Sequence, residues 1–175
     1  VEDTCESLGT RYKKKYLGSF SDFGTFSFYY SHQVTSGEGG MIVCHNDEDY
    51  DILLSLRSHG WARNLINQKK YEKKYKNLDN RFIFLNSGFN LRPTDIQAAI
   101  GSSQFKRMDS VKKIKKKNHK KVINKLKKDK NWKNQFTFIV ENKNIDPNWF
   151  GLSILINTPY INKKKKFLNF LTKVG

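Results

Sequence analysis

A single histidine, His32, lies in a loop-forming stretch that carries the residue types of a phosphate site. Residues 26–40, FSFYYSHQVTSGEGG, place hydroxyl side chains and three glycines around it. Hydroxyls and free backbone N–H groups in such loops bind phosphate oxygens, and an imidazole exchanges protons near neutral pH. The stretch therefore suits a phosphate-bearing group, although turns alone also require glycine.

Two further groups of polar residues stand at the borders of predicted elements. Asp3 ends an apolar strand and Glu6 follows one turn later, where an acidic side chain caps a helix or faces a ligand. Asn90 and Arg92 precede a predicted helix start. That position suits an anion, because helix N-termini expose backbone N–H groups and a guanidinium adds a forked contact. Ordinary capping accounts for each group taken singly.

In their order and spacing, these segments resemble the pyridoxal-phosphate-dependent sugar aminotransferases and dehydratases of the DegT/DnrJ/EryC1/StrS type. The likeness covers residues 1–128 and, more loosely, NWFGLSILI at 148–156. It implies an α/β protein with the fold of fold type I pyridoxal-phosphate enzymes (aspartate aminotransferase-like). The chain would hold the end of the large cofactor domain and the start of the small C-terminal α+β subdomain. The segments that carry the likeness are VEDTCESLG, TFSF, GEGG, LRSHG, GFNLRPTDIQAAIG and Gln104.

The resemblance implies a cofactor, pyridoxal 5′-phosphate or pyridoxamine 5′-phosphate, and residues that hold it. Asp3 would pair with the pyridine nitrogen and keep it protonated, which makes the ring a better electron acceptor. Ser27 would bind the cofactor phosphate, and Glu6 would lie near the ring. Asn90 would reach the phosphate of the neighbouring subunit's cofactor, in a homodimer with shared active sites.

The resemblance also implies two substrates. One is a nucleotide-linked 4-keto-6-deoxy sugar, whose nucleotide these residues leave open. The other is L-glutamate, the amino donor, whose carboxylate Arg92 would hold with its guanidinium fork. Ser31, next to His32, would belong to the same substrate-binding group.

At position 32 the chain departs from the family's usual lysine, which forms the internal Schiff base. An imidazole has no primary amine and cannot form that bond. Ser27 lies five residues before His32 and GEGG begins five residues after it, so the register is fixed. Within the family, a subset with histidine here consists of sugar 3-dehydratases. For this chain the likeness implies His32 as the catalytic base, loss of the C3 hydroxyl and release of ammonia, in lipopolysaccharide or O-antigen deoxysugar biosynthesis.

Three other interpretations stay open. The protein could be a sugar aminotransferase that leaves nitrogen on the product, or a homologue that binds cofactor or partner without turnover. From a different class, the excess of lysine could mark a nucleic-acid-binding module. That interpretation gives no role to residues 26–40.

The elements expected to position these residues follow from periodicity and turn residues. Strands are expected at 25–30, at 41–44 as a buried strand, and at 136–140 and 150–156. A helix is expected at 47–58, a polar loop at 66–80, an extended segment at 82–93, and a last helix from 162. A helix from Thr94 continues as an amphipathic helix whose lysines face solvent. Its apolar stripe consists of Phe105, Met108, Val111, Ile114, Val122, Ile123 and Leu126.

We divide the chain into three parts: 1–104 in the large domain, 105–130 as a connecting helix, and 131–175 in the small subdomain. The chain begins on VED and stops inside a predicted helix, so we expect a fragment of a longer protein. No apolar run approaches 18 residues, so no membrane span is expected.

Composition favours a globular protein over a nucleic-acid reader. The net charge is +17, yet residues 1–60 carry 5 basic and 9 acidic groups. The excess is lysine, 27 against 6 arginines, whereas base readers rely on arginine. Two distant cysteines, Cys5 and Cys44, offer no metal-ligand spacing and cannot alone hold an iron–sulfur centre. They suggest a reducing, cytoplasmic compartment.

Overall fold

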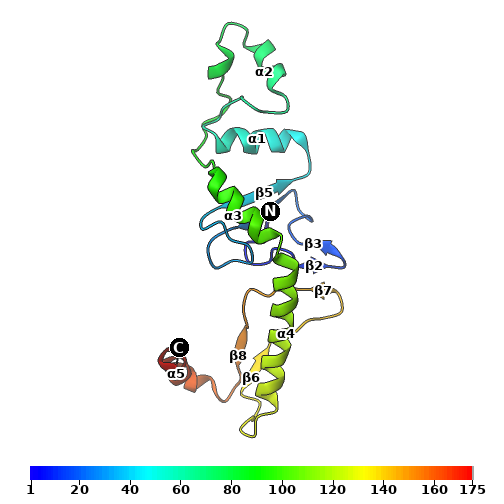
Figure 1. Ribbon diagram of the computed structural model, residues 1–175, viewed down its shortest axis with the longest axis vertical. Coiled ribbons are helices and arrows are strands. Elements are labelled where there is room, and N and C mark those ends of the chain that lie inside the picture. The colour runs from blue at the N-terminus through cyan, green and yellow to red at the C-terminus, as the bar shows by residue number, and fades with distance from the viewer. Residues whose placement is uncertain (175) are drawn as a thin grey trace.

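The computed structural model describes residues 1–174, which form an elongated molecule with both termini away from its long ends (Figure 1). The helices are α1 (Asp47–Arg57), α2 (Gln68–Lys74), α3 (Asp95–Phe105), α4 (Met108–Lys127) and α5 (Lys164–Val174), with the 3-10 turns η1 (Asn80–Phe82) and η2 (Ile161–Lys163). The strands are β1 (Glu2–Asp3), β2 (Arg11–Tyr12), β3 (Lys15–Tyr16), β4 (Phe23–Ser27), β5 (Gly40–Cys44), β6 (Phe136–Phe138), β7 (Ile145–Asp146) and β8 (Ile154–Ile156).

The described strands form three small sheets. β4 lies between β1, which is parallel to it, and β5, which is antiparallel. β2 lies between β3 and β7, and β6 pairs with β8, all antiparallel. Because β7 joins β2, a strand from the last third of the chain is bound to its first twenty residues. Figure 1 shows the first two sheets at mid-length, α1 and α2 towards one end, and α4 leading to β6, β8 and α5 at the other.

The predicted strand at 41–44 is confirmed as β5, but the prediction that it is buried is wrong. Met41 is 44% exposed and Ile42 is 50% exposed. In this chain β5 is an edge strand with β4 as its single neighbour. Its apolar side chains therefore lie partly on the surface.

The predicted helix at 47–58 is confirmed as α1. The Asn46 side chain caps it by accepting a hydrogen bond from the Asp49 backbone N–H at 2.8 Å, and acidic residues in the first turn suit the helix dipole. The buried Asp51 carboxylate accepts backbone hydrogen bonds from Ile66 at 2.7 Å and Asn67 at 3.0 Å. These bonds fix the segment that leads to α2.

The predicted loop at 66–80 is wrong for its first half, which forms α2. Lysine and glutamine are good helix formers, and Gln68 donates to Glu72 one turn later at 2.8 Å. Tyr71 and Tyr75 also pack against a buried cluster, so tertiary contact supports the helix. That cluster consists of Ala62, Leu65 and Ile83.

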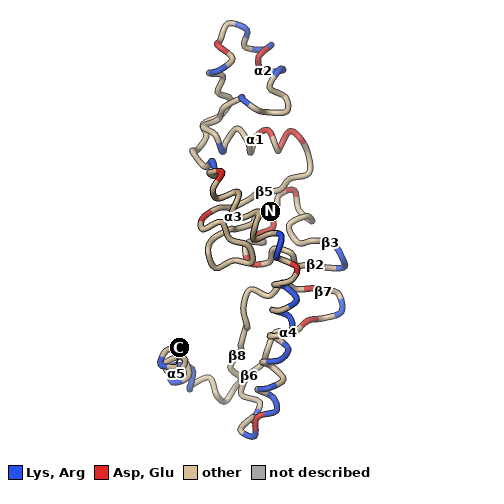
Figure 2. The backbone as a smooth tube through the Cα atoms, viewed as in Figure 1, with Lys and Arg blue, Asp and Glu red and all other residues tan. Residues whose placement is uncertain are grey.

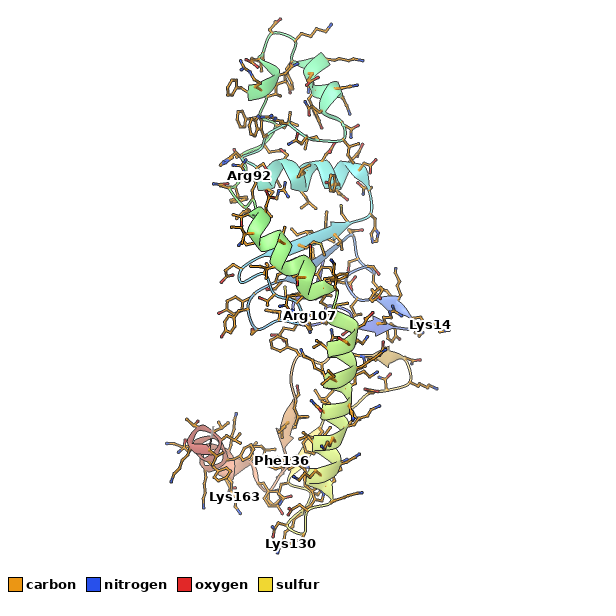
Figure 3. All side chains as sticks on the ribbon, viewed as in Figure 1. Lys14, Arg92, Arg107, Lys130, Phe136 and Lys163 are labelled. Carbon is orange, nitrogen blue, oxygen red and sulfur yellow. The ribbon has the colours of Figure 1, made fainter. Side chains whose placement is uncertain are left out.

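The predicted continuous helix from Thr94 is divided into α3 and α4. A capping box between Thr94 and Gln97 begins α3. Lys106 and Arg107 separate the two helices, and Figure 3 labels Arg107 at their junction. The chain therefore changes direction between the region of β5 and the far end of the molecule.

The expectation that the lysines of α4 all face solvent is wrong at Lys112 and Lys116. Lys112 is 9% exposed, and its Nζ lies 2.7 Å from Asp146 Oδ2 and 2.8 Å from the Gly9 carbonyl. Lys116 Nζ lies 2.7 Å from the other oxygen of the same carboxylate. These partners satisfy ammonium groups that burial would otherwise destabilise. Figure 2 shows many other lysines along α4 and α5.

The C-terminal part contains the predicted strands, as β6 and β8, and the predicted helix as α5. The strands are shorter than expected, and β7 was not predicted. Among residues 1–174, no helix combines the length and apolar character that a bilayer crossing requires. An aromatic cluster links the pieces: Trp132, Phe136, Phe138 and Phe167.

Candidate active site

Three of the predicted site residues, Asp3, Ser27 and His32, gather where the parallel strands β1 and β4 end. Asp3 is paired with Thr25, two residues before Ser27. His32 Nδ1 lies 2.7 Å from the carbonyl oxygen of Cys5, two residues after Asp3. The sheet register and the loop after β4 thus bring these side chains to one end of the sheet.

Backbone hydrogen bonds of Phe28 hold together the two ends of the loop that carries His32. The Phe28 N–H donates to Gly39 at 2.8 Å, and the Ser36 N–H donates to the Phe28 carbonyl at 2.9 Å. At the tip, the His32 N–H donates to the Tyr29 carbonyl at 3.1 Å. The loop spanning residues 28–36 is therefore a closed turn with His32 near its apex.

The surroundings of the His32 ring select its tautomer. A carbonyl oxygen only accepts hydrogen bonds, so the Cys5 contact requires a proton on Nδ1. In the neutral ring Nε2 then keeps a lone pair and is the atom that can take up a proton. The Tyr29 ring lies 6.2 Å from the imidazole and the Phe150 ring 5.3 Å, centroid to centroid. His32 is therefore half-buried between aromatic side chains.

The Asp3 carboxylate is exposed and ionised. Hydrogen bonds from the Cys5 thiol and the Cys5 backbone N–H, the latter at 3.2 Å, lower the pKa of Asp3 below its ordinary value. An ionised carboxylate at this position suits a protonated pyridine nitrogen. The predicted helix cap is not seen, since Asp3 ends a strand and accepts from a turn.

The neighbouring Glu2 fixes the loop beside β4. Burial opposes its ionisation, but backbone N–H groups of Gly18, Ser21 and Phe20 donate to the carboxylate and together lower the pKa of Glu2. The Gly18 backbone also passes so close to Gly24 that a Cβ on Gly24 would lie 2.1 Å from the Gly18 carbonyl oxygen. This close packing sets the course of β4 towards Ser27.

The remaining predicted residues of this region, Ser27, Ser31 and Glu6, have few side-chain contacts within residues 1–174. The half-buried Ser27 Oγ accepts from the Tyr29 N–H at 3.3 Å, so its own O–H stays available as a donor. The side chains of Ser31 and Glu6 are exposed. The Glu6 carbonyl accepts a hydrogen bond from the buried Gln33 amide.

Asn90 and Arg92 lie apart from this group. The segment that carries them is tied to the end of α1, where the Leu91 N–H donates to the Arg57 carbonyl at 3.0 Å and Ser58 bridges to Asn90. Both side chains are exposed, and Figure 3 shows Arg92 at the start of α3, close to α1. No hydrogen bond or ion pair among the described residues joins either one to His32.

Sequence reasoning missed three residues around His32: Gln33, Asn148 and Phe150. Gln33 is buried directly beside His32, and Asn148 and Phe150 come from 115 residues or more further along the chain. The segment NWFGLSILI, which resembles the family loosely, drew attention to the region of Asn148 and Phe150 but gave no role to either residue, and nothing in the sequence distinguished Gln33 from its neighbours.

Comparison with known proteins places these observations in a family. The DegT/DnrJ/EryC1/StrS aminotransferase family profile matches residues 1–175. GDP-4-keto-6-deoxy-D-mannose 3-dehydratase of Escherichia coli O55:H7 is 34% identical over 177 residues, 100% of this chain and 44% of that protein. The dTDP-4-dehydro-2,6-dideoxy-D-glucose 3-dehydratase of Saccharopolyspora spinosa is 30% identical over 181 residues, 98% of this chain and 38% of that protein. The chain thus spans less than half the length of these relatives.

Solved structures agree with the sequence comparison. The E. coli GDP-4-keto-6-deoxy-D-mannose-3-dehydratase with bound hydrated PLP matches with a TM-score of 0.83 at 32% identity, over 99% of this chain and 44% of that one. A GDP-4-keto-6-deoxymannose-3-dehydratase structure with a trapped PLP-glutamate geminal diamine matches with a TM-score of 0.78 at 31% identity, over 98% of this chain and 43% of that one. The predicted fold class is confirmed as part of a fold type I architecture. With a profile match from its first residue to its last and the same backbone course as these enzymes, the chain belongs to the DegT/DnrJ/EryC1/StrS aminotransferase family.

Proposed function

We propose that the protein containing this chain is a nucleotide-sugar 3-dehydratase that uses pyridoxamine 5′-phosphate and L-glutamate. The observation that carries the proposal is His32, in a loop that keeps its Nδ1 on the Cys5 carbonyl and leaves Nε2 as a base. Relatives at 30–34% identity are 3-dehydratases by name. Those two names carry different nucleotides, so the proposed substrate is the class of nucleotide-linked 4-keto-6-deoxy sugars.

The residues present fit the cofactor. Asp3 offers an ionised carboxylate to the pyridine nitrogen, and Ser27 offers a hydroxyl donor to the phosphate, both at the end of the β1–β4 pair. Glu6 follows Asp3 in the same turn. When bound, the pyridoxamine form supplies an amine for the sugar's keto group and a ring that accepts electrons.

His32 performs the proton transfers in this proposal. Nε2 takes a proton from the carbon next to the cofactor amine, and the resulting imidazolium returns one to the departing C3 hydroxyl. The Cys5 carbonyl holds the ring in place throughout, because it accepts from Nδ1 in both protonation states. Since residue 32 is not a lysine, it cannot form a Schiff base with the cofactor, which stays non-covalently bound at this position.

Glutamate restores the amine in the second half of the reaction. The balanced sum converts glutamate and the sugar's C3–OH into 2-oxoglutarate, ammonia and a C3–H, so glutamate supplies two electrons.

Arg92 is the proposed anchor for the glutamate carboxylate, and Ser31 is a proposed substrate contact beside His32. Among residues 1–174, no hydrogen bond or ion pair joins Arg92 or Asn90 to the His32 group, and we propose a homodimer in which each chain completes the partner's site with these two residues. We place this chemistry in the cytoplasm, in lipopolysaccharide deoxysugar synthesis.

The test compares the intact protein with its His32→Lys variant, using GDP-4-keto-6-deoxymannose and glutamate. We expect the unaltered protein to release one ammonia per 3-deoxy sugar. The variant should lose dehydration by about 10²-fold or more, the range of a lost general base. Borohydride should also attach the cofactor covalently to residue 32 of this variant and leave the unaltered protein free of it. His45→Lys, which alters an exposed histidine outside the site, serves as control.

The second candidate is an aminotransferase, which the family's own description favours. The products separate the two. An amino sugar formed without ammonia would replace the dehydratase proposal by this one, and undiminished dehydration by His32→Lys would remove His32 as the base.

A further inference from the structure

Three consecutive residues after β7 contact three separate parts of the chain around His32. The Asn148 N–H donates to Thr10 Oγ1 at 2.9 Å, and its Nδ2 donates to the Leu8 carbonyl at 2.9 Å. The Trp149 ring stacks on His119 of α4, 4.1 Å between centroids and 5° between planes. Phe150 faces the His32 ring. We call residues 148–150 the clamp segment.

The clamp segment is joined to the His32 loop by a buried amide. Gln33 Nε2 donates to the Asn148 carbonyl at 3.2 Å and also to the Glu6 carbonyl. Gln33 is 8% exposed and Asn148 is 3% exposed. Buried polar groups lose stability unless they are hydrogen-bonded, so neither side chain can move without leaving its partners unsatisfied.

The exposed tip of the loop needs this support. Tyr30 is 68% exposed, and the hydrogen bonds of Phe28 and Ser36 fix only the base of the loop. The imidazole itself has one hydrogen bond within residues 1–174, to Cys5. The position of the ring therefore depends on Cys5 on one side and on Gln33 and the clamp segment on the other.

We propose that Asn148 is a positioning residue for His32, which it holds through Gln33 and through the placement of Phe150. The inference rests on the proposed role of His32 as base. Proton transfer requires the base within hydrogen-bond reach of the reacting carbon, and a displacement of about 1 Å costs on the order of 10²-fold in rate. Asn148 thus links the C-terminal part of the chain to the chemistry at the end of β1 and β4.

The experiment uses Asn148→Asp in the intact protein. The substitution keeps the side chain's shape but turns an oxygen towards the Leu8 carbonyl. We expect kcat for dehydration to fall about 10- to 100-fold with KM of the sugar changed less than about threefold. Amide hydrogen exchange in residues 28–36 should rise about fivefold or more, with β6 and β8 unchanged. Asn118→Asp, the same change at an exposed position of α4, should alter neither quantity.

A second variant tests the same hydrogen-bonded link in case Asn148→Asp does not fold. Gln33→Met removes the donor from the same link without placing a charge in the interior, and should raise exchange in residues 28–36 in the same way. Unchanged exchange in that loop in both variants would overturn the inference, as would raised exchange with unchanged kcat. An amino sugar formed without ammonia by the unaltered protein would instead overturn the proposed function, and undiminished dehydration by a His32→Asn variant would remove His32 as its base. In both cases the exchange data would still report whether Asn148 holds the loop.

Discussion

At the scale of single residues, the chemistry depends on which atoms face His32 and Asp3. The Cys5 residue serves both, because its carbonyl accepts from His32 and its N–H and thiol donate to Asp3. A turn of three residues therefore selects the tautomer of the proposed base and lowers the pKa of the proposed cofactor partner.

Asp3→Asn tests that ionisation. The amide is uncharged and loses the charge-assisted contact with a protonated pyridine nitrogen. We expect the intact variant to bind pyridoxamine 5′-phosphate about 10- to 100-fold more weakly, measured by absorbance titration. Asp22→Asn, at an exposed carboxylate outside the site, should bind as the unaltered protein does. Equal affinity for both variants would remove Asp3 from the cofactor site.

Motif spacing was enough to single out His32, Ser27 and Asp3 in the sequence. The register of β1 and β4 and the contact of His32 with Cys5 bring the three to one end of the sheet, and their roles stay predictions. Gln33 and Asn148 could not be identified, because their importance comes from hydrogen bonds to residues over a hundred positions away.

At the scale of elements, α4 is held by charge as well as by apolar contact, and its charged partners lie on and before β7, the strand that pairs with β2. Of its predicted apolar stripe, Met108 and Ile123 are buried, whereas Ile114 is 58% exposed. Lys112 and Lys116 instead converge on Asp146 of β7, and Lys116 and Lys120 also approach Glu141. A helix-period pattern identifies the helix but cannot show which lysines find a carboxylate.

This arrangement predicts an acid-sensitive contribution to stability. Hydrogen bonds from Lys112 and then Lys116 lower the pKa of Asp146. A lowered folded-state pKa adds stability above the ordinary carboxyl value of about 4, and this stability is lost as the pH falls through the folded value. Asp146→Asn should cost about 1 kcal/mol at pH 7, a modest figure because the carboxylate is half exposed.

The measurement is urea unfolding of the intact protein and the variant between pH 7 and pH 3. The difference in free energy of unfolding between the two proteins should be constant above about pH 5 and should shrink as the pH falls further. Asp22→Asn should show no such difference. A gap that persists unchanged at pH 3 would assign the effect of Asp146 to packing instead of charge.

Two elements were missed for physical reasons. α2 is polar and rich in lysine, so it shows no apolar stripe; its good helix formers and its packing on a buried cluster together make it a helix. β7 has two residues, Ile145 and Asp146, which lie opposite Tyr12 and Arg11 of a hairpin strand more than a hundred positions earlier. Strands this short are specified by their partners and not by their own sequence.

At the scale of the whole molecule, basic and acidic side chains are concentrated in different parts of the chain. Lysines cover α4 and α5, whereas the motif-rich N-terminal region carries most of the acidic groups (Figure 2). Large apolar side chains on β5 and α3 are exposed in this chain, among them Ile42, Ile96 and Phe105, at 50%, 74% and 58%. Exposed apolar area on this scale is typical of surfaces that bind another polypeptide, a ligand or a membrane, or that aggregate.

A polypeptide limited to residues 1–175 should therefore bind anilinonaphthalene sulfonate strongly at pH 7. We expect its fluorescence to rise several-fold above that of the intact protein, because apolar side chains on β5 and α3 remain open to the dye. Equal fluorescence at equal molar concentration would contradict this expectation.

The molecule is elongated, and its buried apolar side chains form small separate clusters. A single compact core therefore could not be predicted from the sequence.

The bond between Gln33 and Asn148 also has a consequence for synthesis on the ribosome. The two residues are 115 positions apart. At 5–20 residues per second, the His32 loop emerges about 6–23 s before its support has been made. The nascent chain therefore spends that interval with a His32 loop that is complete in sequence but lacks its contacts with residues 148 and 150, and slow codons between positions 33 and 148 would lengthen it.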